Sequence, residues 1–148
     1  MKLPRYHLKS NERLTTFEFV SEGPKGLIHK LIQFTPTNLK GVYNLSFGDK
    51  DPNTGKINDT SISNNGDSEK VLATVVASVY AFTDKNPDAW VYATGSSKSR
   101  TRLYRMGISK YYAGVKKEFE VYGEASDDWE VFDKDKDYDG FLVRRKKS

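Results

Sequence analysis

Hydrophobic and polar residues alternate in three segments of the N-terminal part of the chain, which is the pattern of strands. The segments cover residues 14–20, 27–35 and 41–47. Alternation with a period of two places every second side chain on one face of a sheet. Since short turns rich in glycine and proline separate the segments, we expect them to form an antiparallel meander.

A helical pattern follows between residues 69 and 83. Its apolar residues recur three or four positions apart, as on one face of a helix. They are Val71, Leu72, Val75, Val76, Val79 and Phe82. Asp67 or Ser68 can cap the start of this helix, and Asn86 with Pro87 ends it.

Shorter elements complete the chain. We expect a strand at 89–93, a second helix from 98 to 106 or beyond, and closing strands at 119–122, 129–132 and 141–145. The order β-β-β-α-β-α-β-β-β predicts a single α+β domain over residues 1–148. It has one mixed, mostly antiparallel sheet and two main helices on one face. We expect an irregular tail at 1–10 and a long polar loop at 49–67, with a possible short strand near 57–62.

Composition narrows the chemistry available to the protein. The chain has 148 residues, 36% of them hydrophobic, and no cysteine, which excludes disulfides, thiolate metal sites and cysteine nucleophiles. No signal peptide or membrane-spanning run is visible, so we expect a cytoplasmic protein without a membrane partner. His7 and His29 are the only histidines, and nothing in the sequence brings them together. We therefore predict neither a metal site nor a cofactor.

Charge is segregated along the chain, although the formal net charge is only +4. Residues 98–117 contain seven Lys or Arg and no acid, and Arg144–Lys147 form a second basic cluster. Residues 118–139 between them are mainly acidic. The segment 133–140 resembles a calcium loop in its spacing of acids, but it has a lysine where a glutamate ligand is needed, so we interpret it as a hairpin turn. Basic segments of this kind either attract a polyanion or form a solvated surface.

The best candidate site is the turn from the strand at 89–93 into the second helix. A glycine lets the backbone approach a ligand, serine hydroxyls donate hydrogen bonds, and the first turn of a helix offers free N–H groups to an anion. Several cations follow within two helical turns. The predicted anion-binding residues are Gly95, Ser96, Ser97, Lys98, Arg100, Arg102 and Arg105.

Three tyrosines accompany these cations and could stack on nucleic-acid bases. They are Tyr104, Tyr111 and Tyr112. Such rings pack against other side chains as readily as against bases, and the serines can be simple helix caps. Both interpretations remain open from the sequence.

The segment from Tyr92 to Met106, YATGSSKSRTRLYRM, resembles the hallmark of a family of small bacterial proteins with a domain of unknown function. This resemblance extends over most of the chain and implies that the segment matters, without implying an activity. The order of elements and the stretch RLYRMGI also resemble GNAT-type N-acetyltransferases. In that family a glycine-rich loop binds pyrophosphate at the first core helix. The corresponding stretch here, 64–69, has one glycine and two acids that repel a pyrophosphate.

Three functions follow as hypotheses. The first is a module that binds a phosphate-bearing partner, above all nucleic acid, through the strand-GSS-helix site. The second is a small enzyme, either a divergent GNAT-like acyltransferase or a metal-independent ribonuclease-type toxin using residues such as His7, His29, Arg100 and Tyr104. The third is a protein-interaction module that docks its basic helix on an acidic partner. The sequence decides neither catalytic status nor oligomeric state.

Overall fold

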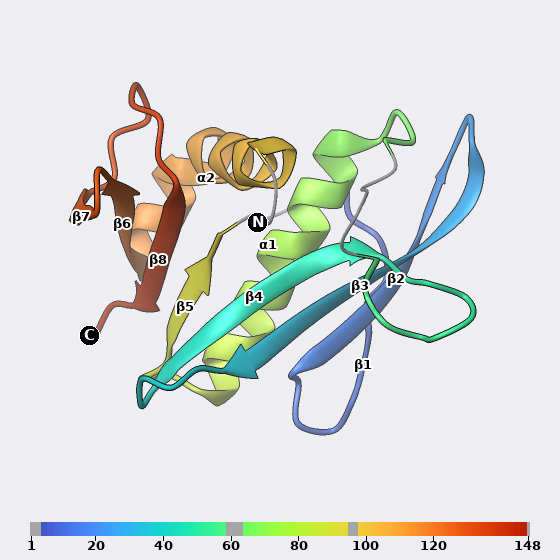
Figure 1. Cartoon of the computed structure of the whole chain (residues 1–148), viewed down its shortest axis with the longest axis horizontal. Coiled ribbons are helices and arrows are strands. Elements are labelled where there is room, and N and C mark those ends of the chain that lie inside the picture. Colours follow the sequence, from blue (N-terminus) through green and yellow to red (C-terminus); the bar gives the residue numbers. More distant parts are fainter. Residues whose placement is uncertain (1–3, 59–63, 95–97, 148) are drawn as a thin grey trace.

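A computed structural model describes residues 4–58, 64–94 and 98–147, and its described part forms one eight-stranded sheet with two helices (Figure 1). The predicted α+β class with a mixed, mostly antiparallel sheet is confirmed. The elements in chain order are β1 (Lys9–Ser10), β2 (Thr16–Gly23), β3 (Gly26–Pro36), β4 (Val42–Asp49), α1 (Ser68–Lys85), β5 (Trp90–Ala93), α2 (Lys98–Glu118), β6 (Phe119–Ala125), β7 (Asp128–Val131) and β8 (Gly140–Arg145).

The strands lie in the order β1-β2-β3-β4-β5-β8-β6-β7. The meander of β2, β3 and β4 is antiparallel as expected, and its first turn uses Gly26 at a φ of +90°, which suits glycine. Among the described strands, β4 and β5 form the one parallel pair, which α1 connects. Strand β8 inserts between β5 and β6, so β7 becomes the far edge.

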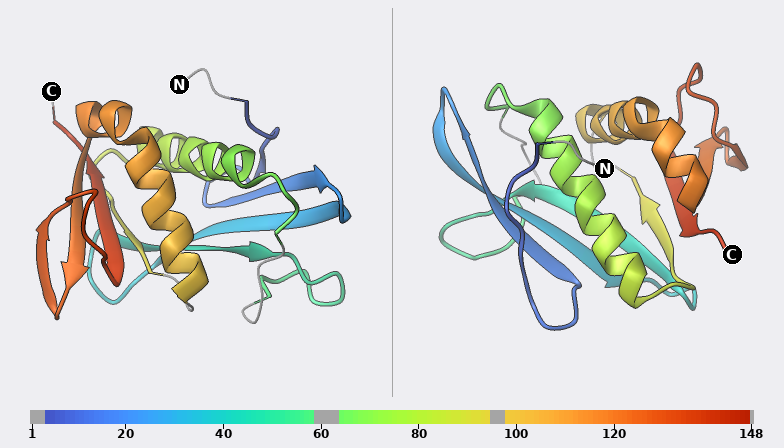
Figure 2. Two further views of the ribbon diagram at one scale, coloured as in Figure 1. Left: turned by 90° about the horizontal axis from the view of Figure 1, so that it is seen from above. Right: turned by 180° about the vertical axis from the view of Figure 1, so that it is seen from behind.

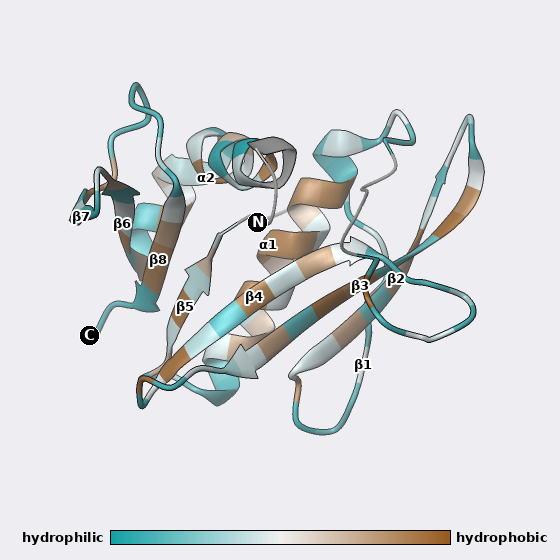
Figure 3. Cartoon of the chain, viewed as in Figure 1, coloured by the Kyte–Doolittle hydropathy of each residue, from teal (hydrophilic) through white to brown (hydrophobic). Residues whose placement is uncertain are grey.

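Both helices cover the same face of the sheet, as seen from behind in Figure 2. Alternate strand residues point to this face and are buried there, among them Phe17, Phe34, Val91 and Phe141. Helix α1 packs Phe82 against these residues, and the ring of Phe82 stacks on that of Phe34 at 4.3 Å between centroids. Figure 3 shows the same arrangement in the hydropathy of the residues: hydrophobic and hydrophilic residues alternate along the strands, and the peripheral loops are mostly hydrophilic.

Helix α2 was expected from residue 98 to 106 or beyond, and it runs to Glu118. Tyr111 and Val115 continue the buried stripe, so packing extends the helix through Gly107. Gly107 also lets the two helices approach, since a Cβ there would lie 3.0 Å from Cδ2 of Leu72. A glycine in this place therefore serves helix contact and does not end the helix.

The ends and loops add three details. Lys9 and Ser10 pair with β2, and Tyr6 before them is buried on the ring of Phe19. Of the possible strand near 57–62, the described part contains a single bridge between Lys50 and Ile57, and residues 59–63 lie outside it. No helix in the described ranges is long and apolar enough to cross a membrane.

Candidate functional site

The parallel strands β4 and β5 stay together for only three residue pairs, from Val42 opposite Trp90 to Asn44 opposite Tyr92. Beyond this point β4 continues to Asp49, whereas β5 ends at Ala93, and the two strands diverge (Figure 1). The chain then leads from β5 into α2. The divergence therefore creates a gap in the sheet beside the start of α2.

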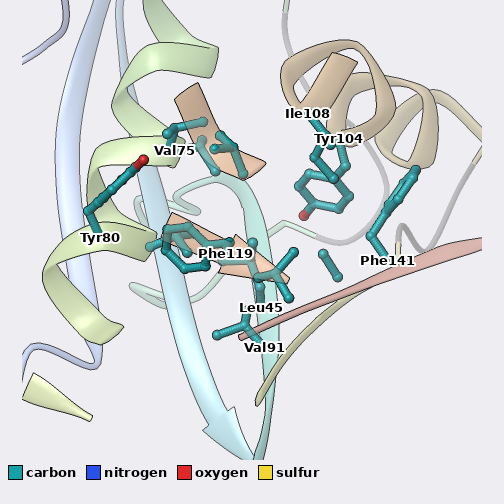
Figure 4. Close-up of a pocket in the computed structure, with 13 residues that line it drawn as sticks. Leu45, Val75, Tyr80, Val91, Tyr104, Ile108, Phe119 and Phe141 are labelled. Carbon is teal, nitrogen blue, oxygen red and sulfur yellow. The ribbon is translucent and has the colours of Figure 1, made fainter. Parts of the chain in front are cut away.

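An apolar cavity of about 80 Å³ lies on the helix side of this gap. Side chains from both helices and from four strands line it, and all of them are aliphatic or aromatic. They are Leu45, Val75, Val76, Val79, Tyr80, Val91, Ala93, Tyr104, Ile108, Val115, Phe119, Phe141 and Val143. The volume is several times what one water needs, and an apolar lining of this kind favours a hydrocarbon group over water. Figure 4 shows Tyr104 reaching from α2 towards the centre of the cavity.

The predicted anion site is described only in part, and none of its residues lines the cavity among the described residues. Gly95, Ser96 and Ser97 fall outside the described residues. Lys98 and Arg100 belong to the first turn of α2, which carries no acid, while their side chains are likewise outside the description. Arg102 is exposed and forms no hydrogen bond or ion pair with the described residues. It is thus the one predicted cation whose guanidinium is seen to face solvent.

Arg105 lies in the same stretch but is engaged inside the protein. Its Nε donates to the carbonyl oxygen of Lys136 at 2.9 Å, and its Nη2 donates to that of Lys134 at 3.4 Å. The carboxylate of Asp137 is 3.3 Å from the same Nε. Because these contacts engage Nε and Nη2 of the guanidinium, Arg105 is a weaker anion ligand than its position in the sequence suggests.

The three tyrosines proposed for stacking are packed against the protein. Tyr104 and Tyr111 are each about 6% exposed, so neither offers a ring face to solvent. Tyr112 is half-buried and lies 5.2 Å from the ring of Phe132, with Lys116 above it. Base stacking by these residues remains a prediction, and the burial of the first two argues against it.

The C-terminal basic cluster is largely neutralised by ion pairs. Arg144 binds Glu120 at 3.0 Å, and Arg145 contacts the carboxylates of Asp84 and Glu118. Arg145 also donates to Thr83 at 2.9 Å and lies over the ring of Phe119, which ties the last strand to α1. These two arginines are therefore structural.

The acidic segment at 133–139 is not the hairpin turn expected from the sequence. Strand β6 lies between β7 and β8, so the segment crosses from one side of β6 to the other. Along the way it supplies the carbonyls that hold Arg105, and the carbonyl of Asp139 accepts a hydrogen bond from Thr94. The acids thus lie beside the start of α2, a proximity that sequence distance concealed.

The two histidines come together in a way that the sequence did not indicate. His7 and His29 line one polar pocket of about 490 Å³ at the end of the sheet formed by β1, β2 and β3, with Lys9, Glu18, Glu22 and Lys50 around them. They approach from opposite sides of strand β2, since His29 belongs to β3 and pairs with Val20 of β2. The described residues contain no group of three His, Asp or Glu able to hold a metal ion. The pocket is distant in the fold from Tyr104, so these residues do not form one catalytic group.

Aromatic side chains on the uncovered face of the sheet were missed by the sequence analysis. Trp90 and Tyr92 on β5 face the same way as Tyr122 on β6 and Trp129 on β7. Their period of two within each strand was the available signal. It remained hidden because only the strand order shows that these strands are neighbours.

Comparison with known proteins gives a family without an activity. No curated protein and no solved structure matches the chain. A family model, described as Family of unknown function (DUF6934), matches residues 2–146, which is nearly the whole sequence. The chain therefore belongs to the family DUF6934.

Proposed function

We propose that the protein binds a phosphate-bearing ligand with an apolar arm, in the gap where β4 and β5 separate. The observation that carries this proposal is the apolar cavity between the sheet and the two helices, which Ala93 at the end of β5 and Tyr104 in the first half of α2 help to line. The cavity receives the arm, and the helix start receives the phosphate. Neither part alone would define a ligand, but together they describe an amphipathic one.

The start of α2 suits a phosphate for electrostatic reasons. Free N–H groups and the helix dipole favour an anion there, and no acid lies in the first turn. Arg102 adds an exposed positive charge near the helix start. The acids at 133–139 lie close by, and Arg105 offsets part of their charge through its contact with Asp137.

An acyl thioester of a nucleotide, such as acetyl-CoA, combines these two parts, as the acyltransferase hypothesis requires. The GNAT resemblance would place its pyrophosphate at the start of α1, so the phosphate site proposed at the start of α2 is a different one. The observed order of strands and helices agrees with the GNAT resemblance. The two acids expected to repel a pyrophosphate at the start of α1 both have partners. Asp67 accepts a hydrogen bond from Tyr6 at 2.6 Å, and Glu69 forms an ion pair with Lys110.

Nucleic acid remains a second candidate because of the exposed cations on α2. Arg102, Lys116 and Lys117 are exposed, and no acid interrupts residues 98–117. A polyanion bound through them would contact phosphates without reading sequence, and its affinity would fall steeply with salt. This candidate does not need the cavity, so the two proposals are separable.

Binding measurements with four ligands distinguish the candidates. We would titrate the protein with acetyl-CoA, coenzyme A, ADP and a short single-stranded RNA at two salt concentrations. Ala93→Leu fills the cavity, Arg102→Ala removes the exposed cation, and Arg13→Ala is the control, since Arg13 is an exposed arginine in the turn between β1 and β2.

The proposal predicts tighter binding of acetyl-CoA than of ADP, a preference that Ala93→Leu abolishes. Arg102→Ala should weaken both ligands roughly three- to tenfold, whereas Arg13→Ala should have no effect. Salt-sensitive RNA binding that is unaffected by Ala93→Leu would support the second candidate instead. Binding of none of the four would reject both and leave docking on an acidic protein as the hypothesis to test.

A further inference from the structure

Figure 1 shows the sheet from the side opposite the helices. The strand register places four aromatic side chains on this face. They form two contacting pairs. Trp90 lies 5.9 Å from Tyr122, and Tyr92 lies 5.7 Å from Trp129. Because this face is opposite the cavity beside α2, a ligand bound on it would be independent of the proposed function.

The first pair already holds a cation from the protein itself. The guanidinium of Arg144 lies 4.2 Å from the centre of the Trp90 ring and donates to the carboxylate of Glu120 at 3.0 and 3.2 Å. This hydrogen bond lowers the pKa of Glu120, so the carboxylate stays ionised. A cation above an aromatic face with a carboxylate beside it is a favourable arrangement.

The second pair has the same components, but no basic side chain of the described residues lies over its rings or pairs with its carboxylate. The rings of Tyr92 and Trp129 meet at 73°, which makes an aromatic corner, and Trp129 is 38% exposed. The carboxylate of Glu124 accepts a hydrogen bond from the Tyr92 hydroxyl at 3.2 Å. No Lys or Arg among the described residues forms an ion pair with Glu124. The corner is thus aromatic and negatively charged.

Gly140 is buried against this corner. It pairs with Glu124 in the register of β6 and β8. A Cβ at this position would lie 3.2 Å from Cε1 of Tyr92 and 3.3 Å from Oε1 of Glu124. A larger residue would therefore require Tyr92 or Glu124 to shift by a few tenths of an ångström.

We propose that the corner formed by Tyr92, Trp129 and Glu124 binds an organic cation, namely an alkylammonium or guanidinium group. The positive charge of this ligand faces the Glu124 carboxylate. The alkyl carbons of an alkylammonium, or the plane of a guanidinium, contact the ring of Trp129. A polyanion is disfavoured on this face by Glu120 and Glu124, whose charges exceed that of Arg144. The cation can be a free amine or a basic side chain of another protein.

Tryptophan fluorescence reports on this face directly, because Trp90 and Trp129 are the two tryptophans of the chain. In a Trp90→Phe background, Trp129 is the sole reporter. We would titrate this protein with tetramethylammonium chloride and with arginine amide, using sodium chloride at equal ionic strength as the reference. The two probes separate alkylammonium from guanidinium recognition.

Glu124→Gln tests the carboxylate, and Glu130→Gln is its matched control. Glu130 is adjacent to Trp129 on β7, but its side chain points to the other side of the strand and pairs with Lys136. Its substitution by glutamine removes the same charge as Glu124→Gln does. We expect saturable quenching by at least one probe, weakened about two- to tenfold by Glu124→Gln and unchanged by Glu130→Gln. Two results would overturn the proposal: a response no larger than that to sodium chloride, or equal responses of the two variants.

Discussion

Nε of Arg105 lies 2.9 Å from the carbonyl oxygen of Lys136, which joins the first half of α2 to the acidic segment between β7 and β8. The contact brings together two stretches of opposite charge. It also removes one arginine from the set of cations that the sequence offered to a ligand. A basic residue near a candidate site can therefore bind a loop of the protein itself, and it is then not available to bind an anion.

We expect Arg105→Ala to release this segment. The variant should lose about 1 kcal/mol of the free energy of unfolding, since two hydrogen bonds to carbonyl oxygens disappear. Hydrogen exchange should become faster at residues 133–139 and stay unchanged in β2–β4. Arg102→Ala serves as the comparison, because Arg102 forms no hydrogen bond or ion pair with the described residues, and equal effects of the two variants would contradict the assignment.

Gly123 on β6 is required by the ring of Tyr138. A Cβ at Gly123 would lie 2.4 to 2.5 Å from three ring carbons, and Tyr138 is 5% exposed. Gly123→Ala should therefore destabilise the protein by about 1–3 kcal/mol in urea unfolding, as other overpacked cores do. Gly114→Ala is the counterpart on the exposed side of α2, where a Cβ meets nothing within 4 Å. This second variant should gain about 0.5–1 kcal/mol, because alanine is the better helix former.

The ion pair of Glu120 with Arg144 predicts a pH dependence of stability. The hydrogen bond from Arg144 lowers the pKa of Glu120 in the folded protein below its ordinary value of 4.5. A lowered pKa stabilises the fold above the ordinary value, and the stabilisation is lost as the pH falls through the folded value. Glu120→Gln should accordingly lower Tm at pH 7. The difference in Tm between this variant and wild type should shrink below pH 4.5. A constant difference across this range, or the same behaviour in the exposed control Glu12→Gln, would refute the expectation.

Tyr6 fastens the N-terminal segment to the start of α1. Its hydroxyl donates to Asp67 at 2.6 Å and accepts from the backbone N–H of Glu22 at 3.0 Å. Tyr6→Phe should lower the free energy of unfolding by about 1.5–3 kcal/mol, since a hydrogen bond to a charged carboxylate is lost. Tyr43→Phe provides the control, because its ring packs on Phe82 while its hydroxyl bonds no described residue. Similar losses in both variants would show that the hydroxyl of Tyr6 is unimportant.

Local patterns in the sequence were sufficient for the secondary structure. Alternation predicted the strands of the meander, and helical spacing from Val71 to Phe82 predicted α1, because these periods follow from backbone geometry alone. The end of α2 was left open beyond residue 106, since the buried positions of Tyr111 and Val115 become known only from the packing.

The candidate site depended on contacts that a single segment does not encode. The sequence by itself determined the α+β class, the two helices and the position of the basic strand–helix turn, because each follows from periodicity or charge within a short window. Only the tertiary structure decided that β4 and β5 part beside a cavity, that Arg105 is occupied by the loop near Lys136, and that Tyr92 meets Trp129. These relationships join residues that are about thirty or more positions apart, and their distances are set by strand order and packing, which no local pattern specifies.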